Sequence, residues 1–317
     1  MQVVLHIGTP KTATTFVQGV WVLNRRRLAE EAGVLYPEAG RLGVRRLVGS
    51  QHSLFFAALD DDHQLGLRIE HDVVEAQAMA DYRARFEVAL DAEIAAARPR
   101  TLLMSSEHLY QNLERPSELR RLRDWVARRS DRPPILLVCL REPTDLITSV
   151  YAEYVRSGHL KGFRSWLTDF LDDPQLPDRR RMDVAEWLAP WAEVFGDDAL
   201  RLVRYRQPGR SGDLCDALGA AAGLPDISGW PRPPRLRASP PAGTLQLMRL
   251  RNRLAPRFRD GRFNPAWNWK ISRRVDRLSL GRPLRLPPEA AARLRALFAE
   301  GEREAARRWL GEDALFP

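Results

Sequence analysis

The chain is poor in cysteine, in lysine and in long apolar runs. Only two of its 317 residues are cysteine, which is too few for a disulfide framework. No stretch approaches the roughly twenty apolar residues that a membrane-spanning helix requires. A strand pattern begins at Val3, which leaves no room for a signal peptide ahead of it. Together these absences predict a cytoplasmic protein.

Lysine is rare although the chain is basic. The 50 basic side chains exceed the 41 acidic ones, for a formal net charge of +9, and lysine occurs only at positions 11, 161 and 270. A GC-rich genome produces such an arginine bias, but the positive excess also suits an anionic partner such as a nucleotide. The sequence contains no helix-turn-helix, RNP or zinc-ligand pattern, so we expect no nucleic-acid partner.

Apolar runs and helical patterns alternate along the chain. Strands are predicted at 3–7, 34–36, 101–105, 135–140 and 199–204. Helical patterns lie near 12–31, 71–97, 117–130, 143–157 and 183–195. This alternation is typical of an α/β fold, with a central, mostly parallel sheet in a three-layer α/β/α arrangement. We expect a single domain with insertions over residues 1–317, in which the Pro/Arg-rich segment 228–285 forms loops, a lid or an acceptor-binding region.

The first strand leads into a loop that begins with a glycine and is rich in threonine. The stretch Gly8-Thr9-Pro10-Lys11-Thr12-Ala13-Thr14-Thr15 follows the strand and opens a helical pattern. Backbone N–H groups at a helix N-terminus bind anions, and the lysine and threonine side chains add a charge and further donors. A Walker A loop would need a glycine directly before the lysine, and none is present. The loop therefore predicts a phosphate cradle that differs from the common ATP motif.

A second anion-binding pattern follows the apolar strand at 135–140. Arg141 comes at the carboxyl end of this strand, where ligands bind in open α/β sheets. Its guanidinium can donate two parallel hydrogen bonds to a phosphate. Pro143 suits the first turn of the next helix, and Ser149 lies about two turns into that helix. We expect Arg141 and Ser149 to contact one anion.

These two segments resemble the PAPS-dependent sulfotransferase family, and in particular its bacterial members. Residues 10–15 are similar to the family's 5′-phosphosulfate loop, with Ala13 where many members have glycine, a change that a helical residue would tolerate. The family's 3′-phosphate site is matched by Arg141, Pro143, Ser149 and Tyr151. The resemblance implies a P-loop-like fold and an enzyme that moves a sulfuryl group from PAPS to a hydroxyl, releases PAP and needs no metal.

The resemblance also implies roles for individual residues. Lys11 would stabilise the leaving phosphate oxygen, and Arg141 with Ser149 would hold the 3′-phosphate. The 5′-phosphate would lie against Gly8, Pro10, Lys11, Thr12, Ala13, Thr14 and Thr15. The acceptor would be a glycan, a glycolipid or a small metabolite. The basic segment 257–285 would cover the donor or the acceptor, or would face an anionic membrane surface.

The transfer also requires a general base for the acceptor hydroxyl. Strand 101–105 runs into Glu107 and His108 at the edge where the donor is expected, and Glu107 is our first candidate, with His108 second. Neighbouring residues of an extended segment face opposite ways, so only one of them should point into the site. His52 is a further candidate on the acceptor side, whereas His6 is expected to be structural or to support the loop from behind.

Two other functions are compatible with these patterns. A P-loop-like NTPase or kinase with an atypical loop would need a Walker B carboxylate and Mg²⁺, whereas the strand at 135–140 ends in Arg141. A catalytically silent nucleotide-binding protein would keep the same loop and differ only in lacking a working base. The sequence predicts no oligomeric state.

Overall fold

The chain forms two compact units. The computed structural model describes residues 1–41, 49–205, 213–234, 239–259, 262–264, 274–275 and 278–316. The first unit comprises Met1–Arg141, Val184–Arg235 and Glu302–Pro317, and the second comprises Glu142–Asp183 and Leu236–Gly301. Within these described ranges, no helix is long and apolar enough to cross a membrane.

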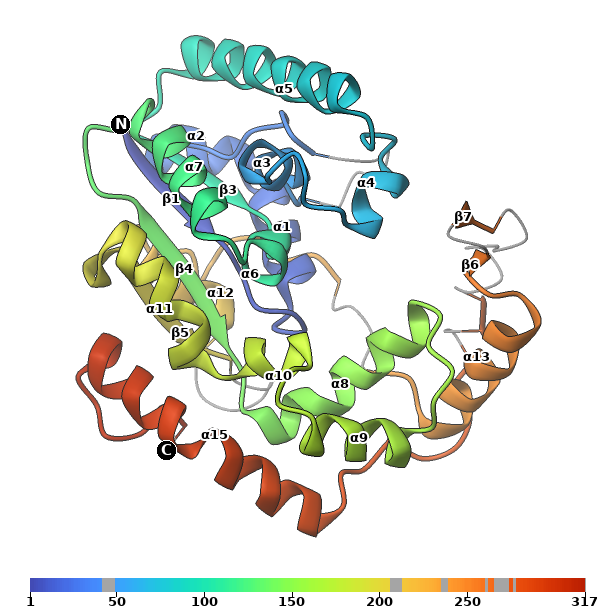
Figure 1. Cartoon of the computed structure of the whole chain (residues 1–317). Coiled ribbons are helices and arrows are strands. Elements are labelled where there is room, and N and C mark those ends of the chain that lie inside the picture. Colours follow the sequence, from blue (N-terminus) through green and yellow to red (C-terminus); the bar gives the residue numbers. More distant parts are fainter. Residues whose placement is uncertain are drawn as a thin grey trace. The chain divides into compact units, whose positions relative to one another are not determined.

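A five-stranded parallel sheet lies at the centre of the first unit (Figure 1), in the order β2-β3-β1-β4-β5. Its strands are β1 (Gln2–His6), β2 (Val34–Leu35), β3 (Thr101–Ser105), β4 (Ile135–Leu140) and β5 (Leu200–Arg204). The predicted α/β class is therefore confirmed. Each predicted strand is present, with its bounds shifted by no more than one residue.

The strands are apolar on both faces because helices cover both faces. Val3, Leu5 and Ile7 belong to one hydrophobic core, whereas Val4 belongs to the core on the opposite face. The first core is packed by α3 (His52–Ala58), α5 (Ala76–Ala97), α6 (Glu107–Asn112), α7 (Pro116–Ala127) and α11 (Val184–Phe195). The second is packed by α1 (Thr14–Leu23), α2 (Arg25–Ala32) and α12 (Leu214–Ala221). Burial on both faces explains the continuous apolar runs of the sequence.

Two of the predicted helical segments differ from the structure, one because it is divided and one because it begins later. The pattern at 12–31 becomes α1 and α2, which meet at Asn24, where the side-chain amide donates to the Val20 carbonyl at the end of α1. The pattern at 71–97 becomes α5 alone, and a short helix α4 (Gly66–Glu70) lies before it. The sequence pattern also did not predict α3, α6, α12 and η1 (Asp197–Ala199) in the first unit.

The second unit is helical. Its main elements are α8 (Pro143–Arg156), α9 (Phe163–Asp172), α10 (Pro177–Met182), α13 (Ala242–Leu254), the first part of α15 (Pro288–Leu310) and a small hairpin of β6 (Phe258–Arg259) and β7 (Arg262–Phe263). Tyr151, Trp166 and Phe298 are buried in its own core. Much of the basic segment 257–285, including Trp267, lies outside the described residues, so its role as a lid or membrane-facing surface stays a prediction.

Candidate functional site

The carboxyl ends of β1, β3 and β4 meet at one edge of the sheet. β1 pairs with β3 on one side and with β4 on the other, and all three run parallel. The loop after β1, the start of α6 after β3, and Arg141 after β4 therefore lie at this edge. In open α/β sheets, ligands bind at the carboxyl ends of the strands, at the point where the order of the strands reverses.

The loop after β1 has an unusual backbone. Gly8, Lys11 and Ala13 have φ values of 51°, 63° and 59°, all in the left-handed region. Left-handed residues interspersed along a loop turn successive N–H groups inward and form a concavity for an anion. Two of the three residues are not glycine, and such strain is typical of ligand-binding loops. The loop geometry fits the predicted phosphate cradle.

Ala13 departs from the expectation made for it. A helical residue would tolerate alanine in place of glycine, but Ala13 is the left-handed N-cap of α1, outside the helix. The left-handed conformation costs an L-residue roughly 1–2 kcal/mol. The alanine is therefore tolerated at the cost of local strain, which a glycine at this position would relieve.

Side chains tie the loop to the end of β4. The Thr12 hydroxyl donates to the Thr9 carbonyl at 2.7 Å, and the Thr9 hydroxyl donates to the Cys139 carbonyl. Arg141 donates from Nη1 to the Lys11 carbonyl at 3.0 Å, and its guanidinium lies 5.0 Å from the centre of the Tyr205 ring. Arg141 thus supports the loop from β4 as well as bringing positive charge to it.

Two buried polar atoms beside the loop lack partners. Within the described residues, neither Thr14 Oγ1 nor His6 Nε2 has a hydrogen-bond partner. Both lie beside Gly8, since a Cβ at that glycine would be 3.4 Å from each of them. A buried polar atom without a partner is costly, so these two atoms are suited to a hydrogen bond with water or with a ligand in the loop. Thr15, by contrast, is exposed.

A chain of hydrogen bonds joins His6 to Glu107. His6 Nδ1 lies 2.9 Å from Ser105 Oγ, and Gln18 Nε2 donates to both Ser105 Oγ at 3.0 Å and Glu107 Oε2 at 3.1 Å. Burial lowers the pKa of His6 to about 4, against the opposing effect of Glu107. Since Ser105 Oγ accepts from Gln18, its own proton is available to the neutral ring at Nδ1. In the tautomer that accepts this proton at Nδ1, the imidazole proton is on Nε2, beside the loop.

Glu107, His108 and His52 form a cluster at the end of β3. One ligand-type atom from each side chain lies within 4.8 Å of the others. The rings of His52 and His108 are perpendicular, with centres 4.4 Å apart. The expectation that only one of Glu107 and His108 would face this place is wrong, because both residues lie in the first turn of α6 and not in an extended segment. All three side chains are partly exposed.

The glutamine before His52 explains how a distant segment reaches the cluster. Gln51 pairs with Ser105 twice: its backbone N–H donates to the Ser105 carbonyl, and its side-chain oxygen accepts from the Ser105 N–H, each at 2.8 Å. Gln51 thus pairs with the end of β3, beyond the residues of this strand that pair with β2. It places His52, at the start of α3, beside Glu107.

Burial and electrostatic interactions keep Glu107 and His52 unprotonated near neutral pH. Burial alone would raise the pKa of Glu107, but His108, His52 and the Gln18 amide outweigh it and hold this pKa below its ordinary value. Burial, together with repulsion from His108, lowers the pKa of His52 to about 3. Near neutral pH, Glu107 is therefore a carboxylate and His52 a neutral imidazole.

The predicted partner of Arg141 lies in the second unit. Ser149 is buried in α8, and its hydroxyl is 3.1 Å from the Ser239 hydroxyl. Arg141 is the last residue of a segment of the first unit. The joint contact of Arg141 and Ser149 with one phosphate therefore stays a prediction.

The sequence prediction missed the residues that hold the cluster together. Gln18, Gln51 and Ser105 are fully or almost fully buried polar residues. Gln18 carries a usable signal, because a glutamine on the apolar face of α1 needs a polar partner. Gln51 and Ser105 carry none, since their pairing depends on how distant segments meet.

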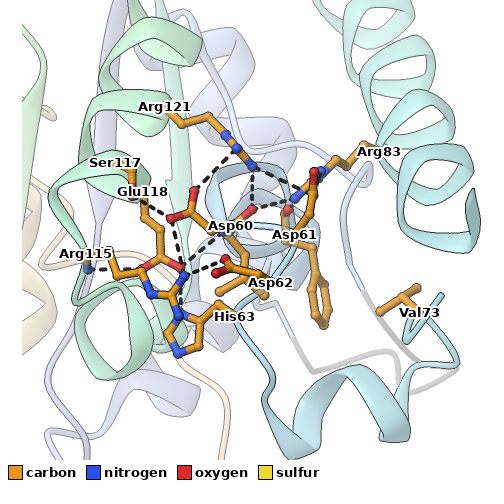
Figure 2. A network of polar contacts seen from close by, with 12 residues as sticks. Asp60, Asp61, Asp62, His63, Val73, Arg83, Arg115, Ser117, Glu118 and Arg121 are labelled. Carbon is orange, nitrogen blue, oxygen red and sulfur yellow. Dashed lines mark hydrogen bonds and ion pairs between the residues drawn. The ribbon is translucent and has the colours of Figure 1, made fainter. Parts of the chain in front are cut away.

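A second carboxylate–histidine cluster in the first unit has a different character (Figure 2). Glu118, at the start of α7, is fully buried. It accepts hydrogen bonds from the backbone N–H groups of Asp60, Glu114 and Arg115 and contacts His63 Nδ1 at 2.6 Å. Figure 2 also shows Asp60 and Asp61 held by Ser117, Arg83 and Arg121. This network fastens the segment after α3 to α7.

Comparison with solved structures finds similarity to a sulfotransferase. A sulfotransferase from Alicyclobacillus acidocaldarius, known from a crystal structure, aligns with a TM-score of 0.44 and 16% sequence identity over 94% of this chain and 96% of that chain. No family model and no curated protein matches the chain. A neighbour at this level of similarity assigns no function to the chain.

Proposed function

We propose that this chain is a PAPS-dependent sulfotransferase that modifies a hydroxyl group. The single observation that carries the proposal is the meeting of a strained anion-binding loop and an ionised, partly exposed carboxylate at one edge of the parallel sheet. The family resemblance of residues 10–15 and of Arg141 supplies the identity of the donor.

The loop is suited to a phosphate or phosphosulfate group. The left-handed residues aim backbone N–H groups inward, and Thr14 Oγ1 and His6 Nε2 offer two further donors without partners in the described structure. In the proposed reaction Lys11 faces the oxygen that links sulfur to phosphate and stabilises the charge that develops there. Arg141 and Ser149 would hold the 3′-phosphate.

Glu107 is proposed to act as the general base. The acceptor O–H gives its proton to the Glu107 carboxylate, the acceptor oxygen forms a bond to sulfur, and the bond between sulfur and the phosphate oxygen breaks, leaving PAP. Gln18 and Ser50 orient the carboxylate through contacts of 3.1 and 3.4 Å. His108 is the alternative base, and His52 lies beside both. The reaction itself is proposed to need no metal.

The acceptor is proposed to be a carbohydrate, a lipid-linked glycan or a small metabolite that carries a hydroxyl. The two alternative functions also use the phosphate-binding loop but differ in the reaction that the protein would carry out. A kinase or NTPase would require Mg-ATP, and a silent nucleotide-binding protein would bind PAP without transferring a sulfuryl group.

Ligand-induced stabilisation separates these functions. The thermal midpoint of the full chain is measured with PAP, with ATP plus Mg²⁺ and with AMP, because a ligand that binds only the folded state stabilises it by mass action. The proposal predicts a rise with PAP that exceeds the rise with AMP. Stabilisation by Mg-ATP without stabilisation by PAP would instead favour the kinase. A screen of hydroxyl acceptors with labelled PAPS then separates an active enzyme from a silent binder.

A further inference from the structure

The cluster of His52, Glu107 and His108 also has the composition of a metal site. Two imidazoles and one carboxylate are a ligand set that binds Zn²⁺ in proteins and leaves a fourth position open. The three donor atoms lie within 4.8 Å of one another. A tetrahedral zinc ion with bonds of about 2.0–2.1 Å requires donors about 3.3 Å apart, so the most distant pair would close by no more than about 1.5 Å.

The individual side chains suit this role. His52 Nδ1 is buried and, in the part of the chain that is described, has no hydrogen-bond partner. This nitrogen carries either a lone pair or an N–H that makes no hydrogen bond within the described residues. Glu107 contributes a carboxylate, and the partial exposure of all three side chains leaves a path for an ion and room for a water ligand.

Neighbouring residues hold the ligands in place, as they do in established metal sites. Gln18 donates to the Glu107 carboxylate. The Asn112 amide lies 3.3 Å from His108 Nδ1, one turn along α6, and would present its oxygen there to a ring that binds zinc through Nε2. The ring of His71 packs against His52, with centres 5.8 Å apart. His71 thus lies beside the ligands that we assign.

We propose that His52, Glu107 and His108 bind one Zn²⁺ ion. The ligand set favours zinc and other borderline metals over Mg²⁺, which prefers an all-oxygen octahedron. The site draws on two separate segments of the sequence, the start of α3 and the start of α6, so no ligand spacing is visible in the chain. Bound zinc would be coordinated by the carboxylate that is proposed as the general base. Zinc should therefore inhibit sulfuryl transfer reversibly, and in this one respect the inference rests on the proposed function.

Direct binding measurements test the site without any reaction. The metal-free full chain is titrated with ZnCl₂ by calorimetry, in parallel with MgCl₂, and its thermal midpoint is followed with each ion. We expect one Zn²⁺ per chain, a rise in the midpoint with zinc and none with magnesium. His52→Ala, His108→Ala and Glu107→Gln should each weaken zinc binding about 100-fold or more.

His63→Gln is the matched control, since His63 lies beside a glutamate in the same unit but outside the cluster. Its zinc affinity should equal that of the wild type, and circular dichroism confirms that each variant is folded. Absence of zinc binding in the wild type, or affinity that survives all three cluster variants, would overturn the proposal. Zinc that binds but does not inhibit transfer would uphold the metal site and remove Glu107 as the base.

Discussion

The first unit contains two carboxylate–histidine clusters that differ in almost every physical respect. Glu118 is fully buried, and three backbone N–H groups and His63 surround its two oxygens. Glu107 is partly exposed and is contacted by the side chains of Gln18 and Ser50. The first carboxylate is part of the packing of the fold, whereas the second is held in place by side chains and remains open on one side.

The difference teaches how to separate structural from functional carboxylates in this chain. A satisfied, buried carboxylate stabilises the loop and helix around it, and its removal leaves several donors without partners. Glu107, by contrast, lies beside the buried His52 Nδ1, which has no hydrogen-bond partner among the described residues. Such a carboxylate contributes less to the stability of the fold and is available to bind a ligand. We therefore expect mutations in the two clusters to separate stability from activity.

The largest expected difference in stability comes from removing each glutamate in turn. Glu118→Ala should lower the free energy of unfolding by about 3 kcal/mol, because it strips a buried carboxylate from its donors. Glu107→Ala should change it by no more than about 1 kcal/mol. Thermal unfolding of both variants measures this, and equal losses would remove the distinction between the clusters.

The pH dependence of transfer should follow Glu107. Its pKa is held below the ordinary 4.5, so the base is ionised and activity is present above that value and lost as the pH falls through the lowered pKa. Activity should therefore persist from about pH 7 down to about pH 5. A histidine base with an ordinary pKa near 6.5 would instead lose activity between about pH 7 and 6. A pH profile of kcat/KM distinguishes the two.

Two threonines of the phosphate loop should respond in opposite directions. Thr14→Val replaces a buried hydroxyl without a partner, so it should raise the free energy of unfolding by about 1 kcal/mol and weaken PAP about tenfold. Thr12→Val removes the hydrogen bond to the Thr9 carbonyl and should lower stability by about 1 kcal/mol. Thermal midpoints with and without PAP test both changes. A lower free energy of unfolding for Thr14→Val would show that the Thr14 hydroxyl stabilises the fold.

The smallest expected effect is at the N-cap of α1. Ala13→Gly should raise the free energy of unfolding by about 0.5–1 kcal/mol, because the relief of a left-handed alanine exceeds the entropy cost of glycine. Chemical denaturation measures the change. A destabilised variant would mean that the loop does not carry this strain in solution.

The sheet was predictable, and the site was predictable only in part. Apolar runs such as 135–140 are covered by helices on both faces, so their composition alone defines buried parallel strands. The left-handed backbone at Ala13 was not predictable, because helical and loop conformations both fit the residues around it. The cluster was missed as a unit, because Gln51 brings His52 to β3 through a contact between positions 54 residues apart.

The central claim is that Glu107 serves as the base for sulfuryl transfer at a site that binds PAP. The direct measurement compares wild type and Glu107→Gln in two assays: transfer from labelled PAPS to a panel of glycans, glycolipids and small hydroxyl compounds, and stabilisation by PAP. We predict that Glu107→Gln lowers turnover by about 10²–10⁴-fold while the PAP-induced rise in the thermal midpoint is unchanged. Turnover by Glu107→Gln at the wild-type rate would contradict the claim.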